Sequence, residues 1–183
     1  MSKMYFAENP DASHDIHELR VELLGEKMTF LTDAGVFSKK MIDYGSRVLL
    51  STLDFGKGET LLDVGCGYGT LGLTLAKAQT LKVTLVDINQ RALDLTRKNA
   101  AVNQVSAEIF QSNVYENVTG KFQHIISNPP IRAGKKVVHE VISGSYNHLL
   151  DDGDLTIVIQ KKQGAPSAKA KMEEVFGNCE TLK

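Results

Sequence analysis

The chain has 183 residues, of which 42% are hydrophobic, and its formal net charge is −1 at pH 7. This length and apolar content predict one domain with a well-buried core, while the charge excludes a protein that holds nucleic acid by bulk positive charge alone. Cys66 and Cys179 are the two cysteines; they form no disulfide framework and no metal-ligand spacing, so we expect a reduced, cytoplasmic setting and no metal. No apolar run approaches bilayer-spanning length, which predicts a soluble protein without a membrane partner.

The first 18 residues are polar and are expected to form an arm. They include His14 and His17, but no third ligand for a metal ion. Two stretches in which apolar residues alternate follow at positions 19–23 and 28–32, on either side of Gly25. This pattern predicts a β-hairpin.

A helix is expected from residue 38 to about residue 52, because apolar residues recur there at helical spacing and Ser38 is a suitable N-cap. Residues 32–37, between hairpin and helix, are small except for one aromatic. They form either the cover of a ligand or a plain connector. We assign residues 1–55 to an N-terminal extension and residues 56–183 to the core of a single domain.

The most specific unit is a buried strand at residues 60–64 that leads into Gly65-Cys66-Gly67-Tyr68-Gly69 and then into a helix. Glycines in such a turn let the backbone approach a ligand where any Cβ atom would collide. A second buried strand ends in Asp87, 22 residues beyond Gly65. At that spacing a carboxylate accepts hydrogen bonds from ribose hydroxyls, so the pair predicts an adenosine-type cofactor.

The identity of that cofactor depends on Asp63. The run from Gly67 to Gly72 also satisfies the dinucleotide fingerprint, but that pattern alone is weak. Asp63 stands two residues before the first glycine, where a carboxylate suits a cationic ligand with a free amine and is poorly placed beside a pyrophosphate. The sequence therefore favours S-adenosylmethionine over a nicotinamide cofactor, and a nicotinamide-dependent oxidoreductase becomes the weaker alternative.

The rest of the chain continues this alternation of strands and helices. The expected elements are a helix at 90–103, strands at 107–110 and 122–127, a helix at 134–150 interrupted by Gly144, a turn at 151–154, a fifth buried strand at 155–159, a helix at 166–176 and the start of a strand at 179–183. Short links between them predict an α/β fold with a doubly wound, mostly parallel sheet. Ligands bind such sheets beyond the carboxyl ends of the strands, where Asn113 is expected to meet an adenine amine and where Asn128 follows the fourth strand.

Asn128 is followed by Pro129 and Pro130. Each proline lacks an N–H group, and each residue before a proline is held in extended geometry. The backbone at this corner therefore accepts hydrogen bonds but hardly donates them, which suits it to gripping an NH2 group on a nucleobase or a carboxamide. The alternative is an ordinary Asn-Pro turn.

Asp63-x-Gly65-x-Gly67-x-Gly69, Asp87 and Asn128-Pro129-Pro130 together resemble the class I S-adenosylmethionine-dependent methyltransferases that act on an amine nitrogen. The longer sequence segments at residues 32–38 and 128–135 resemble those of the small-subunit (16S) ribosomal RNA guanine-N2 methyltransferase family. The resemblance covers roughly residues 30–183. It implies a Rossmann-like fold, S-adenosylmethionine as cofactor and ribosomal RNA or the small ribosomal subunit as partner.

The resemblance also implies a set of site residues. Asn128, Pro129 and Pro130 are the expected catalytic residues. Ile131, Arg132, Lys135 and Lys136 are expected to contact the substrate, the three cations by holding phosphates, unless they form only a solvated helix start. Cofactor contacts are expected from Thr32, Phe37, Asp63, Gly65, Cys66, Gly67, Gly69, Asp87, Ile88, Asn113, Val114 and Asn128. His124, His139 and His148 are expected to be structural or exposed.

Two departures from the family pattern stand out. Ile131 occupies the position at which many amine methyltransferases have a base-stacking aromatic, which disfavours adenine-N6 chemistry on DNA. The related fold closes with a hairpin of two strands, but this sequence has room for one, so it is either a shortened form or completes the sheet edge in another way. A glutamine-amide protein methyltransferase and a non-catalytic module for ribosome assembly stay open as alternatives. Self-association is not predicted from the sequence.

Overall fold

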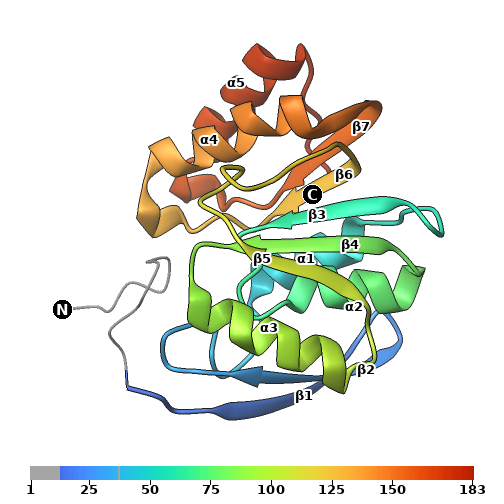
Figure 1. Ribbon diagram of the computed structural model, residues 1–183. Helices are drawn as coiled ribbons and strands as arrows, with labels where there is room; N and C mark the ends of the chain where they lie inside the picture. Colours follow the sequence, from blue (N-terminus) through green and yellow to red (C-terminus); the bar gives the residue numbers. More distant parts are fainter. Residues whose placement is uncertain (1–12, 37) are drawn as a thin grey trace.

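The computed structural model describes residues 13–36 and 38–183, so most of the predicted arm lies outside the described residues. Figure 1 shows the chain beginning with the expected hairpin, formed by β1 (His17–Leu23) and β2 (Glu26–Thr32). The strands pair antiparallel and are joined by Leu24 and Gly25, both with positive φ. Two such residues give a tight turn whose twist matches that of the strands.

The core of the fold is a sheet of five parallel strands. They are β3 (Thr60–Val64), β4 (Lys82–Asp87), β5 (Ala107–Gln111), β6 (Phe122–Ser127) and β7 (Leu149–Ile157). Their order across the sheet is β5-β4-β3-β6-β7. The winding therefore reverses between β3 and β6, and the predicted doubly wound α/β fold is confirmed.

Helices cover both faces of this sheet, as Figure 1 shows. On one face lie α1 (Tyr44–Thr52), α2 (Thr70–Gln79) and α3 (Gln90–Val102), with the hairpin packed against α2 and α3. On the other lie α4 (Lys135–Ser145) and α5 (Ala165–Phe176). Three short 3-10 segments complete the chain: η1 (Ile131–Ala133), η2 (Tyr146–His148) and η3 (Lys161–Gln163).

Neighbouring residues of β3 belong to opposite cores because side chains alternate along a strand. Leu61 packs with the core of α1, α2 and α3, and Leu62 with the core under α4. Both are fully buried. Within the described part of the chain, no helix combines the length and apolar character needed to cross a bilayer.

The helix expected from Ser38 begins six residues later. Ser38 has φ 58°, and its hydroxyl donates to the carbonyl of Met41 at 2.5 Å, so this residue forms a turn. The helix is α1, and its N-cap is Asp43, which accepts a hydrogen bond from the Ser46 N–H group. The prediction of a helix start at residue 38 was wrong.

Three further expectations at the C-terminal end were wrong. Residues 151–154 lie inside β7, because pairing with β6 overrides their turn propensity. Gly153 is needed there, since a Cβ atom would come within 2.8 Å of the Gln123 carbonyl. Gly144 does not interrupt α4, which runs through it to Ser145. Residues 179–183 contain no strand.

We expect Gly72→Ala to destabilise the fold although Gly72 lies within α2. A helical Gly→Ala change normally stabilises by about 1 kcal/mol. Here the new Cβ atom would lie 2.7 Å from Leu85 Cδ2, and Leu85 is fully buried and has nowhere to move. Overpacking of this kind costs about 1–3 kcal/mol, and urea unfolding should show that net loss. In a Leu85→Ala background the same change should cost less, although Asp63 Oδ2 still lies 3.1 Å from the new Cβ atom; an equal loss there would contradict the steric explanation.

Candidate functional site

A cavity of about 310 Å³ lies at the carboxyl ends of the central strands, where the strand order reverses. Residues from the turn after β3, from the ends of β4 and β5, and from the corner after β6 line it. Most of the residues predicted from the sequence are among them: Gly65, Cys66, Gly67, Asp87, Ile88, Asn113, Val114, Asn128, Pro129 and Pro130. The fold thus brings together motifs that are up to 65 positions apart in the sequence.

The glycine turn forms the floor of the cavity. Gly65 and Gly67 have φ of 73° and 58°, which favours glycine at both positions. A Cβ atom built on either would meet no protein atom within 4 Å, so the space beside them is open to a ligand. Gly69 differs, because its Cβ atom would lie 2.7 Å from Leu73 Cδ1. It does not line the cavity, and its small size serves the packing of α2.

Asp87 holds the turn from the end of β4. Its Oδ2 accepts a hydrogen bond from the Gly67 N–H group at 2.8 Å, and its Oδ1 accepts one from the Asn89 N–H group at 2.8 Å. Burial raises the pKa of Asp87 to about 6, although these N–H groups favour the charged form. At neutral pH the side chain is therefore a carboxylate at the cavity wall, with lone pairs left for a ligand's hydroxyls.

Asp63 lies deeper than the sequence suggested. The side chain is fully buried and does not line the cavity. Its Oδ2 accepts the Gly72 N–H group at 3.0 Å, which fastens the start of α2 beneath the glycine turn, whereas its buried Oδ1 has no hydrogen-bond partner among the described residues. Burial raises the pKa of Asp63 to about 7, against the effect of the Gly72 hydrogen bond.

The segment between β2 and α1 forms one wall of the cavity through Val36 and Ser38. Thr32, at the end of β2, is fully buried and outside the cavity wall; its hydroxyl donates to the Lys39 carbonyl at 2.5 Å. The expected contact of Phe37 lies outside the described residues. The segment thus lines the cavity through residues other than the predicted Thr32.

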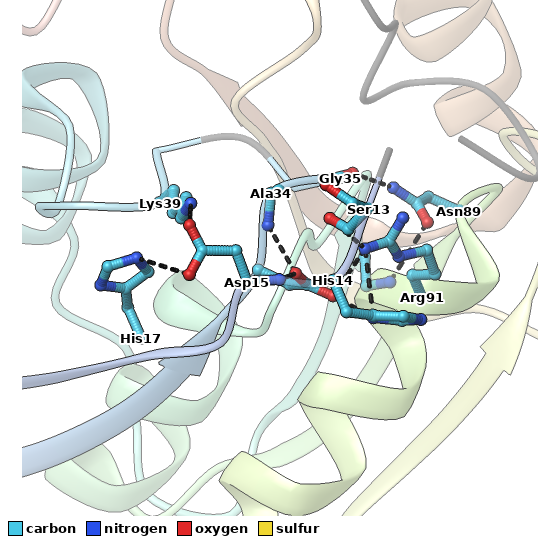
Figure 2. A network of polar contacts seen from close by, with 11 residues as sticks. Ser13, His14, Asp15, His17, Ala34, Gly35, Lys39, Asn89 and Arg91 are labelled. Carbon is cyan, nitrogen blue, oxygen red and sulfur yellow. Dashed lines mark hydrogen bonds and ion pairs between the residues drawn. The ribbon is translucent and has the colours of Figure 1, made fainter. Parts of the chain in front are cut away.

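A polar network anchors this wall to the start of α3, as Figure 2 shows. Asp33 accepts hydrogen bonds from the Asp15 N–H group at 2.6 Å and from Arg91 Nη2 at 2.7 Å. Asn89 donates from Nδ2 to the Gly35 carbonyl at 2.9 Å. Burial alone would raise the pKa of Asp33, but the hydrogen bonds from Arg91 and the Asp15 backbone outweigh it and hold that pKa well below its usual range. The segment between β2 and α1 is thus bound to Asn89, whose backbone N–H group also donates to Asp87.

The corner after β6 presents few free carbonyls. The Ser127 hydroxyl donates to the Val64 carbonyl at 2.7 Å, which joins the ends of β6 and β3. The Ser127 carbonyl accepts from the Val158 N–H group, and the Pro130 carbonyl accepts from Ala133. Among the backbone acceptors on either side of Asn128, this leaves the Pro129 carbonyl without a donor in the described part of the chain.

Sequence reasoning missed the partners of Asn128. Its Nδ2 donates to Asp43 Oδ2 at 2.9 Å and to Ser46 Oγ at 3.2 Å, and both residues line the cavity. No described residue donates to Asn128 Oδ1. The spacing of Asp43 and Ser46, which is that of an N-cap and its third helical residue, was a signal for the helix start, but nothing in the sequence linked it to Asn128.

The three cations among the expected substrate contacts lie outside the cavity wall. Arg132, Lys135 and Lys136 are exposed, and Lys136 lies 3.8 Å from the carboxylate of Glu140. The side chain of Ile131 is outside the described part of the chain. The three cations thus follow the proline corner on η1 and at the start of α4, and they do not line the cavity.

The three histidines after residue 100 make structural contacts. His124 lies between the carboxylates of Glu59 and Asp154, each at 2.9 Å. His139 pairs with a serine of α5, and His148 stacks on Tyr115. None of them lines the cavity, and the described residues hold no cluster of side chains suited to a metal ion.

A sheet of this order, in which a glycine turn lies beside a strand that ends in an acid, is typical of domains that bind an adenosine-type cofactor. The chain belongs to the methyltransferase small domain family, whose model matches residues 27–183. This confirms the resemblance drawn from the motifs.

Individual relatives agree with this family. The uncharacterized protein YbxB of Bacillus subtilis is 45% identical over 181 residues, which are 96% of this chain and 90% of that protein. Ribosomal RNA small subunit methyltransferase C of Aeromonas hydrophila is 43% identical over 137 residues, or 72% of this chain and 40% of that protein. The chain spans about half the length, or less, of the relatives that carry this second name.

A solved structure extends the agreement to three dimensions. The T. thermophilus 16S rRNA N2 guanine methyltransferase, in complex with AdoMet and guanosine, matches 94% of this chain with a TM-score of 0.86 and 28% identity. The match covers 48% of that protein. The ribosomal protein L11 methylase of Lactobacillus delbrueckii matches 64% of this chain with a TM-score of 0.57.

We expect the stability of this domain to fall as the pH rises from 5 to 7.5. A carboxyl group whose pKa is raised by folding binds more protons in the folded state, so its stabilising effect is lost as the pH rises through that pKa. For Asp63, with a folded pKa of about 7, the loss over this range is about 2 kcal/mol. Urea unfolding at both pH values should show that fall, and Asp63→Asn should reduce it to the smaller fall that Asp87, with a pKa raised to about 6, contributes over the same range. An equal pH dependence in the two proteins would contradict the assignment.

Proposed function

We propose that this chain is an S-adenosylmethionine-dependent methyltransferase that modifies the exocyclic N2 amine of a guanine in small-subunit ribosomal RNA, in the cytoplasm. The observation that carries the proposal is the shared cavity: the glycine turn, Asp87 and Asn128-Pro129-Pro130 all line it. The family and the similarity to the guanine-N2 methyltransferase with AdoMet and guanosine support the same assignment.

The cavity suits the proposed cofactor. Gly65 and Gly67 leave open space where side chains would stand, and the Asp87 carboxylate beside them is suited to ribose hydroxyls. Asn113 and Val114 line the end of the cavity at which an adenine ring is expected. Asp63, whose pKa of about 7 leaves it partly ionised at neutral pH, adds part of a negative charge below the turn, which favours a cationic ligand. When bound, S-adenosylmethionine supplies a methyl group activated by its positively charged sulfur.

The proline corner holds the substrate amine. The lone pair of the guanine N2 atom is delocalised into the ring, which makes the amine a poor nucleophile. Asn128 Oδ1 and the Pro129 carbonyl accept its two N–H groups and favour a pyramidal nitrogen whose lone pair faces the methyl donor. Orientation of this kind supplies much of the rate, and the two acceptor dipoles stabilise the positive charge that develops on nitrogen.

No residue in the described cavity wall is a strong base at the corner, and the reaction does not need one. A methylated amine that has gained positive charge is acidic and loses its proton to water. In structured RNA the amine is reached only when the nucleotide is unpaired or extruded. Arg132, Lys135 and Lys136 then hold the phosphates on either side of that nucleotide.

Transfer of labelled methyl groups tests the proposal directly. Bare ribosomal RNA, small ribosomal subunits and ribosomal protein are offered separately, and the modified nucleoside is identified from the product. We expect incorporation into RNA as N2-methylguanine and a loss of about 100-fold or more in kcat for Asn128→Ala, because one amine acceptor is removed. Cofactor affinity should fall less than threefold.

Each outcome of this experiment separates one alternative. Label in glutamine side chains of ribosomal protein would replace the proposal with a protein methyltransferase. Cofactor binding without transfer to any of the three substrates would favour a non-catalytic assembly module. Full activity of Asn128→Ala would overturn the amine-clamp mechanism even if RNA is the substrate.

The exposed cations give a second, independent prediction. Replacing Arg132, Lys135 and Lys136 by alanine together should weaken RNA binding about tenfold or more at physiological salt and flatten its salt dependence, because phosphate contacts release counterions. Cofactor affinity, measured by calorimetry, should be unchanged, since none of the three lines the cavity. A matched triple change at Lys161, Lys162 and Lys169, on η3 and α5, controls for lost charge. Equal loss of RNA and cofactor binding would refute the phosphate-holding role.

A further inference from the structure

We propose that Asp43 is a positioning residue for methyl transfer: it holds the Asn128 amide in the one orientation that turns Oδ1 toward the substrate amine. This inference rests on the proposed function and deepens it. Asp43 lies 85 positions from Asn128 in the sequence, and the two side chains meet at 2.9 Å in the wall of the cavity.

The chemistry of the pair fixes the orientation of the amide. A carboxylate only accepts hydrogen bonds, so the end of the Asn128 amide that faces Asp43 must be its NH2 group. Ser46 Oγ takes the second N–H bond at 3.2 Å. With both of its protons engaged by α1, the amide presents only its oxygen to an incoming amine. A flipped amide would instead turn the Asn128 NH2 group toward the N–H groups of the substrate amine, and no hydrogen bond could form.

Asp43 is itself held rigidly. The same Oδ2 atom accepts the Ser46 N–H group at 3.0 Å as the N-cap of α1. That helix is fixed in the core by Leu49 and Leu50, which are each 2% exposed. A side chain at Gly45 would come within 3.2 Å of Asp43 Oδ2 and 3.5 Å of Asn128 Nδ2, which shows how closely the backbone of α1 approaches this contact. The orientation of Asn128 is therefore set by a helix whose inner face is anchored in the core.

The size of the effect follows from the strength of the contact. Hydrogen bonds to a charged group are stronger than neutral ones. Without the hydrogen bond to Asp43, the Asn128 amide populates both orientations. The usual free energy of a hydrogen bond to a charged group then corresponds to a fall in kcat of about tenfold to 100-fold. Cofactor affinity does not depend on the amide orientation, so the loss appears in kcat while the cofactor dissociation constant stays within about threefold.

The test separates positioning from helix capping. Asp43→Ser keeps a good N-cap, but its short side chain no longer reaches Asn128. Its kcat on the RNA substrate should fall about tenfold to 100-fold with little change in the melting temperature. Asp43→Asn retains an acceptor oxygen and should recover at least about threefold of that loss. Ser46→Ala, which removes the second acceptor, should have a smaller effect of the same kind.

A double-variant cycle then shows whether Asp43 acts through Asn128. If it does, Asp43→Ser combined with Asn128→Ala should be no slower than Asn128→Ala alone. Losses that multiply in the double variant would overturn the proposal, as would full activity of Asp43→Ser. A structural role would lower the melting temperature of both Asp43 variants and would not produce this non-additivity.

A spectroscopic measurement keeps the inference independent of the substrate assignment. The side-chain NH2 signals of Asn128 are identified in a nitrogen–proton correlation spectrum by their loss in Asn128→Ala. They should shift in Asp43→Ser without any substrate present, because their acceptor is gone. If the wild-type protein fails to methylate RNA but these signals shift, the proposed function fails and the contact stands; if they do not shift, the positioning role is refuted.

Discussion

The site depends on the pairing of β3 with β6. These strands meet at the reversal of the strand order, and the Ser127 hydroxyl joins their ends by donating to the Val64 carbonyl, across 63 positions of sequence. That pairing places the glycine turn, which follows β3, beside the Asn-Pro-Pro corner, which follows β6. Neither motif is a site alone, because a methyl donor over the turn needs an amine at the corner. The strand order therefore brings the two halves of the site together.

Four aspartates serve this arrangement in different ways because their surroundings differ. Asp63 is fully buried and accepts one hydrogen bond, from Gly72, whereas Asp87 is half-buried and accepts backbone hydrogen bonds from Gly67 and Asn89. Loss of solvation raises the pKa of each. Asp33 is also buried, but it gathers donors from Arg91 and from two backbone N–H groups, so its pKa is lowered. Asp43 faces the cavity and accepts from α1 and Asn128 together. Residue type alone would not have separated these roles; the solvation of each carboxylate and the charged donor Arg91 beside Asp33 do.

The sequence predicted features whose signals are local. Each of three such features is encoded by a few consecutive residues: the glycine turn, Asp87 at the end of a buried strand, and the proline corner with few donors. All three line the cavity. Asp43, Ser46 and the Asp33 network were missed because their partners lie tens of positions away. The false turn at 151–154 has the same cause, because pairing with the distant strand β6 overrides local propensity. The false helix start at Ser38 is a local error, because the Ser38 hydroxyl closes a turn by donating to the Met41 carbonyl.

The geometry also limits what the corner itself can recognise under the proposed function. Asn128 Oδ1 and the Pro129 carbonyl offer acceptors to any planar NH2 group, so they do not distinguish guanine from a carboxamide. Selection must then come from groups that contact the rest of the substrate, and the exposed cations after the corner are suited to phosphates, which an RNA carries and a glutamine side chain does not. Under the proposed function, the amine acceptors in the cavity thus serve the reaction and the exposed cations serve recognition. A near-neutral chain can then act on a polyanion, because positive charge is needed only on the residues that follow the corner.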